Sequence, residues 1–301
     1  PMTIQDLHGI IPPLVTPMTD DGHLDNYGLE RLIEHVINGG VHGIFILGTT
    51  GEGPSLSYDL RRSMIAKTSV LMKKRVPLLV GITDTSIDES IDLANISKLN
   101  GANAVVVAPP YYFNMGQKEF IDYIKHLSNH CPLPIFLYNM PGLTRLQIDV
   151  NTVVSLLKLK NVVGIKDSSG NMDYYKQLCE SVADYPVFNG PEELLADSLN
   201  LGGNGGVSGG ANLFPKLYVD LYEAYHHKND LLVQEYQNKI LKVSESLYHI
   251  GTGEGTFIRG LKCALFQLGI CNDYVALPYV KYDSKDVMKL RQNLTAITEI
   301  S

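Results

Sequence analysis

The chain has 301 residues, of which 45% are hydrophobic, and its formal net charge is −7. This length and apolar content suffice for one large domain, or for a barrel with an appendage. An acidic chain without a block of basic residues is a poor candidate for binding nucleic acid. No apolar run approaches the roughly 20 residues that a membrane-spanning helix needs. We therefore expect neither nucleic acid nor a membrane among its partners.

Short apolar segments alternate with amphipathic segments of helical length from the beginning of the chain to about residue 227. Eight of the short segments are predicted to be strands: residues 9–15, 43–47, 78–82, 104–108, 135–138, 162–166, 187–189 and 206–208. A helical return between successive strands makes neighbouring strands parallel. Eight such units are typical of a closed (β/α)₈ TIM barrel of about 250 residues. An open doubly wound sheet is the alternative, but it would carry a glycine-rich fingerprint after an early strand, and the sequence has none.

Several helices can be placed along the chain by their caps and periodicity. Residues 29–37 carry apolar side chains at helical spacing. The next helix is predicted to begin after Ser57 as its N-cap and to run to Lys74. Another starts at Ser86, where Glu89 is expected to complete a capping box.

The pattern after about residue 228 is helical only. It predicts helices over residues 231–250 and 256–268, and a last helix from about Ser284. These exceed what a barrel requires. We therefore predict a (β/α)₈ barrel carrying the active site over residues 1–227 and a C-terminal helical region over residues 228–301.

The sixth predicted strand ends in a lysine. Four apolar residues, 162–165, precede Lys166 and indicate a strand buried on both faces. A lysine at the end of such a strand is costly to bury unless its charge is paired or its pKa falls. A lysine with a lowered pKa is a nucleophile for carbonyl carbon. The alternative, a lysine that reaches solvent, is the commoner case for a lysine considered alone.

Catalytic residues of such barrels come from the carboxyl ends of different strands. In this chain, polar and reactive side chains gather at the ends of the predicted strands. They are residues 48–52, residues 109–112, Tyr138, Lys166, residues 190–193 and Ser208. Lys166 would attack the ketone of a 2-oxo acid, and the resulting iminium would allow a nearby carbon–carbon bond to break or form. Tyr138 is the candidate proton shuttle. Thr50 and Tyr112 are candidates for relaying its proton.

A carboxylate could be held by the turn 48–51, which offers backbone N–H groups and two hydroxyls. Structural interpretations remain open for several residues. Thr49 and Thr50 fit an ordinary turn, and Tyr138 fits an aromatic at the barrel mouth. Glu192 and Glu193 fit acids in the first turn of a helix, which is the interpretation we favour for Glu193.

Neither a metal site nor a disulfide is indicated. The nine histidines form no metal-binding signature, and His126 and His130, four residues apart, lack a third ligand in pattern. The four cysteines are scattered, and a chain of this length needs no disulfide. Residues 1–6 lack the regions of a signal peptide. We therefore expect a cytoplasmic protein without a metal.

Three motifs, taken together in this order, resemble those of the pyruvate-dependent class I aldolases, a family that includes dihydrodipicolinate synthase and N-acetylneuraminate lyase. The motifs are Gly48-Thr49-Thr50-Gly51-Glu52, Tyr138-Asn139-x-Pro141 and Gly164-Ile165-Lys166-Asp167. The resemblance covers nearly the whole chain. It implies a (β/α)₈ barrel with C-terminal helices, a homotetramer, and no metal or organic cofactor.

The resemblance also implies roles for single residues. Lys166 would form the Schiff base, Tyr138 would transfer protons, and Thr49 and Thr50 would bind the carboxylate. Tyr112 would enter the relay of a neighbouring subunit. The Gly190 carbonyl and Val207 would line the pocket.

The substrate loop is similar to that of the lyase branch. In dihydrodipicolinate synthase an arginine two residues past the proline grips a second carboxylate, whereas this chain has Leu143 there. Arg145 follows two residues later, at a position where members of the family have a small residue. Residues Asn189-Gly190-x-Glu192-Glu193 resemble an acidic motif that contacts substrate hydroxyls in the lyase branch, and Ser208 falls on a hydroxyl-contacting serine.

The resemblance therefore implies reversible cleavage of a sugar-derived 2-oxo acid to pyruvate and an aldehyde. The 2-oxo acid would be N-acetylneuraminate or a 2-keto-3-deoxy sugar acid. Three alternatives stay open. They are dihydrodipicolinate synthase activity with aspartate semialdehyde, a 2-keto-3-deoxy sugar acid dehydratase, and a non-catalytic sensor on the same scaffold.

Overall fold

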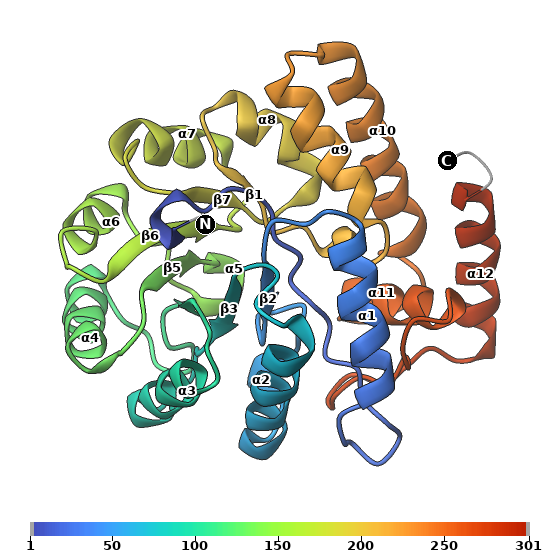
Figure 1. Ribbon diagram of the computed structural model, residues 1–301, viewed down its shortest axis with the longest axis horizontal. Coiled ribbons are helices and arrows are strands. Elements are labelled where there is room, and N and C mark those ends of the chain that lie inside the picture. The colour runs from blue at the N-terminus through green and yellow to red at the C-terminus, as the bar shows by residue number, and fades with distance from the viewer. Residues whose placement is uncertain (1–2, 299–301) are drawn as a thin grey trace.

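Eight parallel strands form the centre of the molecule, surrounded by helices (Figure 1). The computed structural model describes residues 3–298. Hydrogen bonds join the strands in the order β1-β8-β7-β6-β5-β4-β3-β2. Their bounds are β1 Gly9–Ile10, β2 Ile44–Ile46, β3 Leu78–Gly81, β4 Ala104–Val107, β5 Ile135–Asn139, β6 Val162–Asp167, β7 Val187–Asn189 and β8 Gly205–Gly206.

The residues after β1 close the barrel against β2. Pro13 forms a parallel bridge with Phe45. The Leu14 N–H donates to the Phe45 carbonyl at 2.8 Å, and the Phe45 N–H donates to the Pro12 carbonyl at 3.0 Å. β1 ends at Ile10 and is shorter than the predicted strand over residues 9–15. The reason is that Pro12 and Pro13 have no backbone N–H to donate to a ladder. The predicted (β/α)₈ barrel is confirmed.

Helices follow the strands, and all but the single turn α5, which lies at the rim, pack around the outside of the barrel. Their bounds are α1 Asn26–Asn38, α2 Tyr58–Met72, α3 Ile87–Leu99, α4 Gln117–His130, α5 Pro141–Thr144, α6 Val150–Leu156, α7 Met172–Ser181, α8 Leu195–Asn200 and α9 Pro215–His226. Ser57 caps α2 by accepting from the Leu60 N–H. Ser86 caps α3, but its own N–H donates to Asp84 rather than to Glu89, so only half of the predicted capping box forms.

Two hydrophobic cores follow from the alternation of side chains along the strands. The larger core lies between the barrel and its helices and includes Val105 and Ile165. The smaller core fills the barrel interior, where the rings of Phe136 and Phe188 meet edge to face with centroids 6.1 Å apart. The interior is therefore packed, and space for a ligand is left at its rim.

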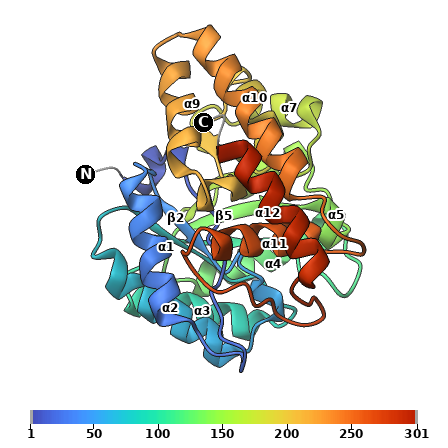
Figure 2. The same ribbon diagram turned by 90° about the vertical axis from the view of Figure 1, so that its right-hand side faces the viewer.

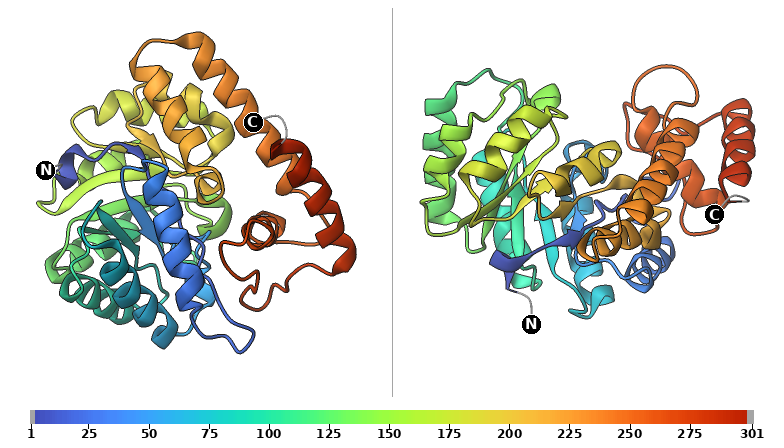
Figure 3. Two further views of the ribbon diagram at one scale, coloured as in Figure 1. Left: turned by 45° about the vertical axis from the view of Figure 1, so that its right-hand side comes forward. Right: turned by 90° about the horizontal axis from the view of Figure 1, so that it is seen from above.

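Three helices follow the barrel and lie at one side of it (Figures 2 and 3). They are α10 Asp230–Leu247, α11 Thr256–Gln267 and α12 Ser284–Thr298, close to their predicted bounds. The division of the chain at residues 227 and 228 into two units stays a prediction. Across residues 3–298, no helix combines the length and apolar character that crossing a membrane requires.

Candidate active site

Lys166 and Tyr138 lie side by side on neighbouring strands. They are directly paired in the register of β5 and β6. Both side chains are buried, and the Lys166 Nζ lies 4.1 Å from the centroid of the Tyr138 ring and 5.5 Å from that of Phe45. A backbone ladder thus places a primary amine against a phenol at the carboxyl end of the barrel.

A bulge in β6 determines which way Lys166 points. Ile135 pairs with Val162, but Phe136 pairs with Gly164, so Val163 is an extra residue in the ladder. Val162 belongs to the outer core and Val163 to the barrel interior. Strict alternation from Val162 would turn Lys166 outward, and the extra residue reverses that parity. Lys166 accordingly lines a small hollow inside the barrel.

The Tyr138 hydroxyl is bonded within the rim. Thr49 Oγ1 lies 3.1 Å from it, at the carboxyl side of β2. Burial raises the pKa of Tyr138, but the nearby Lys166 ammonium and hydrogen bonds from Thr49 and Ser168 outweigh it, so the pKa is lowered below its ordinary value. A tyrosine with a lowered pKa is suited to exchanging a proton with substrate.

The turn after β2 is tightly constructed. The Glu52 N–H donates to the Thr49 carbonyl at 3.0 Å. A Cβ on Gly51 would lie 3.0 Å from the Leu14 carbonyl oxygen, so a larger residue there would displace backbone. Thr50 is buried in this turn. The hydroxyl beside Tyr138 is that of Thr49, and the predicted relay through Thr50 stays a prediction.

A cavity of about 250 Å³ opens beside Tyr138. Phe45, Met140 and Leu143 provide apolar walls, and its polar side chains are three threonines and two tyrosines: Thr49, Thr83, Thr144, Tyr111 and Tyr138. No charged side chain is among the lining residues. Phe45 also borders the hollow of about 10 Å³ that Lys166 and Val207 line. The Lys166 amine therefore lies in a hollow that shares Phe45 and Val106 with a cavity walled by hydroxyls and apolar groups.

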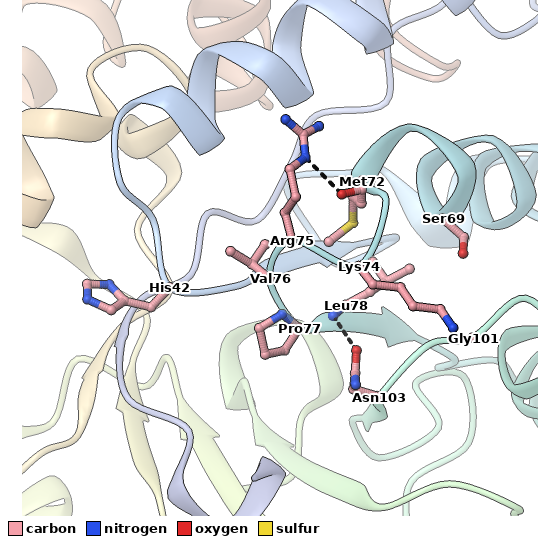
Figure 4. A pocket seen from close by; sticks show the side chains of 10 residues that line it. All are labelled: His42, Ser69, Met72, Lys74, Arg75, Val76, Pro77, Leu78, Gly101 and Asn103. Atoms are coloured by element: carbon pink, nitrogen blue, oxygen red, sulfur yellow. Dashed lines mark hydrogen bonds between the residues drawn. The ribbon is translucent and has the colours of Figure 1, made fainter. Parts of the chain in front are cut away.

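Two larger hollows lie away from this rim. One of about 510 Å³, shown in Figure 4, is lined by His42, Lys74, Leu78 and Asn103, among others, at the amino ends of the strands. The other, of about 710 Å³, lies between α1, α9, α10 and α12. Because active sites of such barrels lie at the carboxyl ends of the strands, we assign the chemistry to the cavity beside Tyr138.

The aromatic loop after β4 is held by Arg145. One guanidinium nitrogen donates to the Tyr111 carbonyl at 2.9 Å and also to that of Tyr112. This arginine therefore braces the loop instead of replacing the arginine absent at Leu143. Tyr112 is 72% exposed and Phe113 is 80% exposed, so the structure does not bring Tyr112 to Tyr138 within one chain.

The Glu192 carboxylate accepts hydrogen bonds from other groups of the protein. It accepts from the Tyr218 hydroxyl and, at 3.2 Å, from the Gly210 N–H. Burial raises its pKa to about 7. The carboxylate does not line the cavity beside Tyr138, so its predicted contact with substrate hydroxyls, which stays a prediction, would require these bonds to be exchanged. Glu193 instead accepts from Ser244 at 2.6 Å.

The remaining predicted residues lie at β7 and β8. Gly190 packs against Ser168, whose Oγ would be 2.0 Å from a Cβ at this position. Val207 belongs to the barrel interior. Ser208 is the next residue along, and its hydroxyl is buried without a hydrogen-bond partner. A Cβ on Gly206 would lie 2.7 Å from both Ser208 Oγ and Leu195 of the outer core, so Ser208 faces away from the barrel interior that holds Val207.

The comparisons with known proteins agree with this geometry. Residues 6–297 match the Dihydrodipicolinate synthetase family. The chain belongs to this family. A 4-hydroxy-tetrahydrodipicolinate synthase of Magnetococcus marinus is 29% identical, with 96% of this chain and 97% of that protein covered. A probable 2-dehydro-3-deoxy-D-pentonate aldolase of Escherichia coli is 31% identical, with 96% of each chain covered.

Solved structures of the family are similar throughout. A dihydrodipicolinate synthase from Bacteroides thetaiotaomicron is 48% identical with a TM-score of 0.94, and the match covers 96% of this chain and 98% of that one. YagE, an Escherichia coli prophage protein solved in complex with pyruvate, is 29% identical with a TM-score of 0.91. The match covers 97% of this chain and 98% of that one. The expectation of an enzyme is confirmed: this family member is a carbon–carbon lyase of the class I aldolase kind.

Sequence reasoning missed three residues at the rim. Ser168 acts on Tyr138, and Phe45 and Thr83 line its cavity. Ser168 had a usable signal, because it stands two residues beyond Lys166 and side chains two apart share a face of a strand. Thr83 had one too, because it is a polar residue directly after the predicted strand 78–82. Phe45 had none, since an inward-facing residue of a buried strand cannot be told from an outward-facing one without the register.

Proposed function

We propose that this enzyme reversibly cleaves a sugar-derived 2-oxo acid to pyruvate and an aldehyde through a Schiff base on Lys166. The observation that carries the proposal is the cavity beside Tyr138, whose lining has hydroxyls and apolar groups but no charged side chain. A polyhydroxylated chain matches such a lining because each buried hydroxyl needs a partner. N-acetylneuraminate and 2-keto-3-deoxy sugar acids share this chemistry.

The proposed reaction begins when Lys166 passes its ammonium proton to the Tyr138 phenolate and the neutral amine attacks the ketone carbon. A carbon–nitrogen bond forms, the former ketone oxygen leaves as water with the proton held by Tyr138, and the iminium withdraws electrons from the adjacent carbon. Tyr138 then removes the proton of the hydroxyl at the fourth carbon, and the bond between the third and fourth carbons breaks to release the aldehyde. The remaining enamine takes up a proton, and water attacks the iminium to release pyruvate. Thr49 and Thr50 hold the substrate carboxylate during these steps.

A second function, condensation of pyruvate with aspartate semialdehyde, is favoured by the 48% identity to the Bacteroides thetaiotaomicron dihydrodipicolinate synthase. Against it stands the absence of an arginine from the cavity lining. Leu143 occupies the predicted arginine position, and the Arg145 guanidinium is bound to backbone carbonyls. A carboxylate without a cationic partner is costly to bury. The first function is therefore our choice.

The chemistry can be tested with pyruvate alone. Borohydride reduction in the presence of pyruvate should add one pyruvate-derived group to Lys166, detected by intact-protein mass and peptide mapping. Lys166→Ala should show no adduct. An unsubstituted enzyme that gains no adduct would exclude Schiff-base chemistry.

The substrate is then decided by three parallel assays. Release of pyruvate from N-acetylneuraminate or 2-keto-3-deoxygluconate supports the proposal. Consumption of 2-keto-3-deoxygluconate without pyruvate release indicates the dehydratase. Turnover only with pyruvate and aspartate semialdehyde overturns the sugar-acid assignment in favour of the synthase.

We also propose a cytoplasmic homotetramer. The adjacent exposed rings of Tyr112 and Phe113, with centroids 5.2 Å apart, support burial of this loop by another copy of the chain. Four free, buried cysteines suit a reducing compartment. Light scattering on the purified enzyme tests the assembly, and a monomer would remove Tyr112 from the proton relay.

A further inference from the structure

A buried ion pair joins the C-terminal helices to the turn that follows β2. Lys262 of α11 is fully buried, and its Nζ donates to Glu52 Oε2 at 2.6 Å. The same nitrogen donates to the Tyr274 carbonyl at 2.6 Å. The other carboxylate oxygen, Oε1, accepts from the Ala276 N–H at 2.8 Å. Both oxygens of one carboxylate are therefore held by residues that follow the barrel.

Glu52 is also the residue that closes the turn bearing Thr49 and Thr50. Its φ is +58°, in the left-handed region that residues other than glycine rarely adopt. At the other end of the turn, Leu47 has a φ of +59°. The Glu52 N–H donates a hydrogen bond to the Thr49 carbonyl. Conformations of this kind persist only where the surroundings hold them, and the contacts of the Glu52 side chain supply such a hold.

Stability alone is a weak reason for this ion pair. Burial lowers the pKa of Lys262, and Glu52 opposes that effect, so the ammonium depends on its partner. Well-packed apolar residues of similar volume often replace such pairs without loss of stability. A charge pair at this place is better explained by the direction that its hydrogen bonds impose on Glu52.

We infer that Lys262 is a positioning residue: by holding Glu52, it keeps Thr49 and Thr50 in place to receive the carboxylate of the 2-oxo acid. The inference rests on the proposed function, which assigns the carboxylate to this turn. It gives the C-terminal helices a part in substrate binding although they lie outside the barrel. Lys262 touches no reacting atom and acts only through Glu52.

The test uses the paired variant Glu52→Gln with Lys262→Met, which removes both charges and keeps similar side-chain volumes. Pyruvate concentration is varied during borohydride trapping, and the adduct on Lys166 is measured by mass. We expect the concentration for half-maximal trapping to rise about tenfold, with the same adduct yield at saturation. A merely structural pair would lower the melting temperature and leave that concentration unchanged.

A matched control comes from the same region. Lys239 and Glu235 form an ion pair at 3.1 Å within α10 and share no partner with Glu52 or Lys262, so Lys239→Met with Glu235→Gln should leave half-saturation within twofold. The same shift in this control would overturn the inference. A folded Glu52→Gln, Lys262→Met variant with unchanged half-saturation would also overturn it.

The single variant Glu52→Asp serves if the paired variant fails to fold. It keeps a negative charge for Lys262 but shortens the side chain that holds the turn, and we expect half-saturation to rise at least threefold. A folded Glu52→Asp enzyme that saturates like the unsubstituted one would refute the role. Failure of the proposed function is recognised separately, because the unsubstituted enzyme would then form no adduct on Lys166.

Discussion

Replacing Thr49 by valine tests whether its hydroxyl supports proton transfer by Tyr138. The substitution keeps the shape of the side chain and removes the oxygen that lies 3.1 Å from the Tyr138 hydroxyl. A hydrogen bond between neutral groups contributes about 0.5–1.5 kcal/mol net, and 1.36 kcal/mol corresponds to a tenfold change in rate. We therefore expect kcat to fall by roughly 2- to 12-fold.

The pH dependence gives the prediction a direction as well as a size. The bond from Thr49 is one of the interactions that lower the pKa of Tyr138. Removing it raises that pKa, so the limb of the pH–rate profile that reports Tyr138 should move to higher pH. Steady-state kinetics between about pH 6 and 11, a range that brackets the model-peptide pKa of tyrosine near 10, measure both effects.

Thr50→Val is the matched control, because the two residues are neighbours in one turn. We expect it to weaken pyruvate binding without moving the Tyr138 limb. The reasoning is refuted if Thr49→Val leaves kcat and the limb unchanged, or if Thr50→Val alone moves the limb. The second result would restore the relay predicted for Thr50.

Three further predictions concern Tyr138, Glu192 and His42. Tyr138→Phe keeps the ring beside Lys166, so the borohydride adduct should still form while turnover falls by about 10²-fold or more; unchanged turnover would remove Tyr138 from the mechanism. Burial raises the pKa of Glu192 to about 7 from 4.5, so unfolding free energy should fall by up to about 3 kcal/mol as pH rises between these values. The unfolding free energy of Glu192→Gln, measured by urea denaturation, should not show that fall. If the variant and the unsubstituted protein have the same pH dependence, Glu192 is not its source. Burial lowers the pKa of His42, whose Nδ1 accepts from the Ile10 N–H at 3.0 Å. The free energy of unfolding should therefore fall as pH drops below about 6.5. His42→Asn should flatten this fall in urea denaturation, and an equal dependence of unfolding free energy on pH in the variant would contradict the prediction.

The strand count was predictable because each buried strand is a short apolar run between turns. The length of β1 was not, since Pro12 and Pro13 continue the path of the chain without donating to a ladder. The bulge at Val163 was also hidden. Valine is an ordinary strand residue, and an extra one is visible only against the partner strand.

The site was predictable as far as strand ends determine it. Lys166 and Tyr138 were expected at one rim, and the register pairs them directly. The choice between Thr49 and Thr50 depends on turn conformation, which the sequence pattern leaves open. Glu192 meets Tyr218, and Lys262 meets Glu52 across 210 residues of sequence. Such distant pairings carry no local signal.

The pairing of Tyr138 with Lys166 has a consequence for how this enzyme can change. The proposed nucleophile and proton carrier are aligned by the backbone of β5 and β6, whereas Leu143 and Tyr111 reach the cavity from segments beyond the strands. Loop substitutions can therefore exchange the accepted aldehyde while the bond-breaking apparatus stays intact. A screen for new substrates should diversify the loops and leave the ladder untouched.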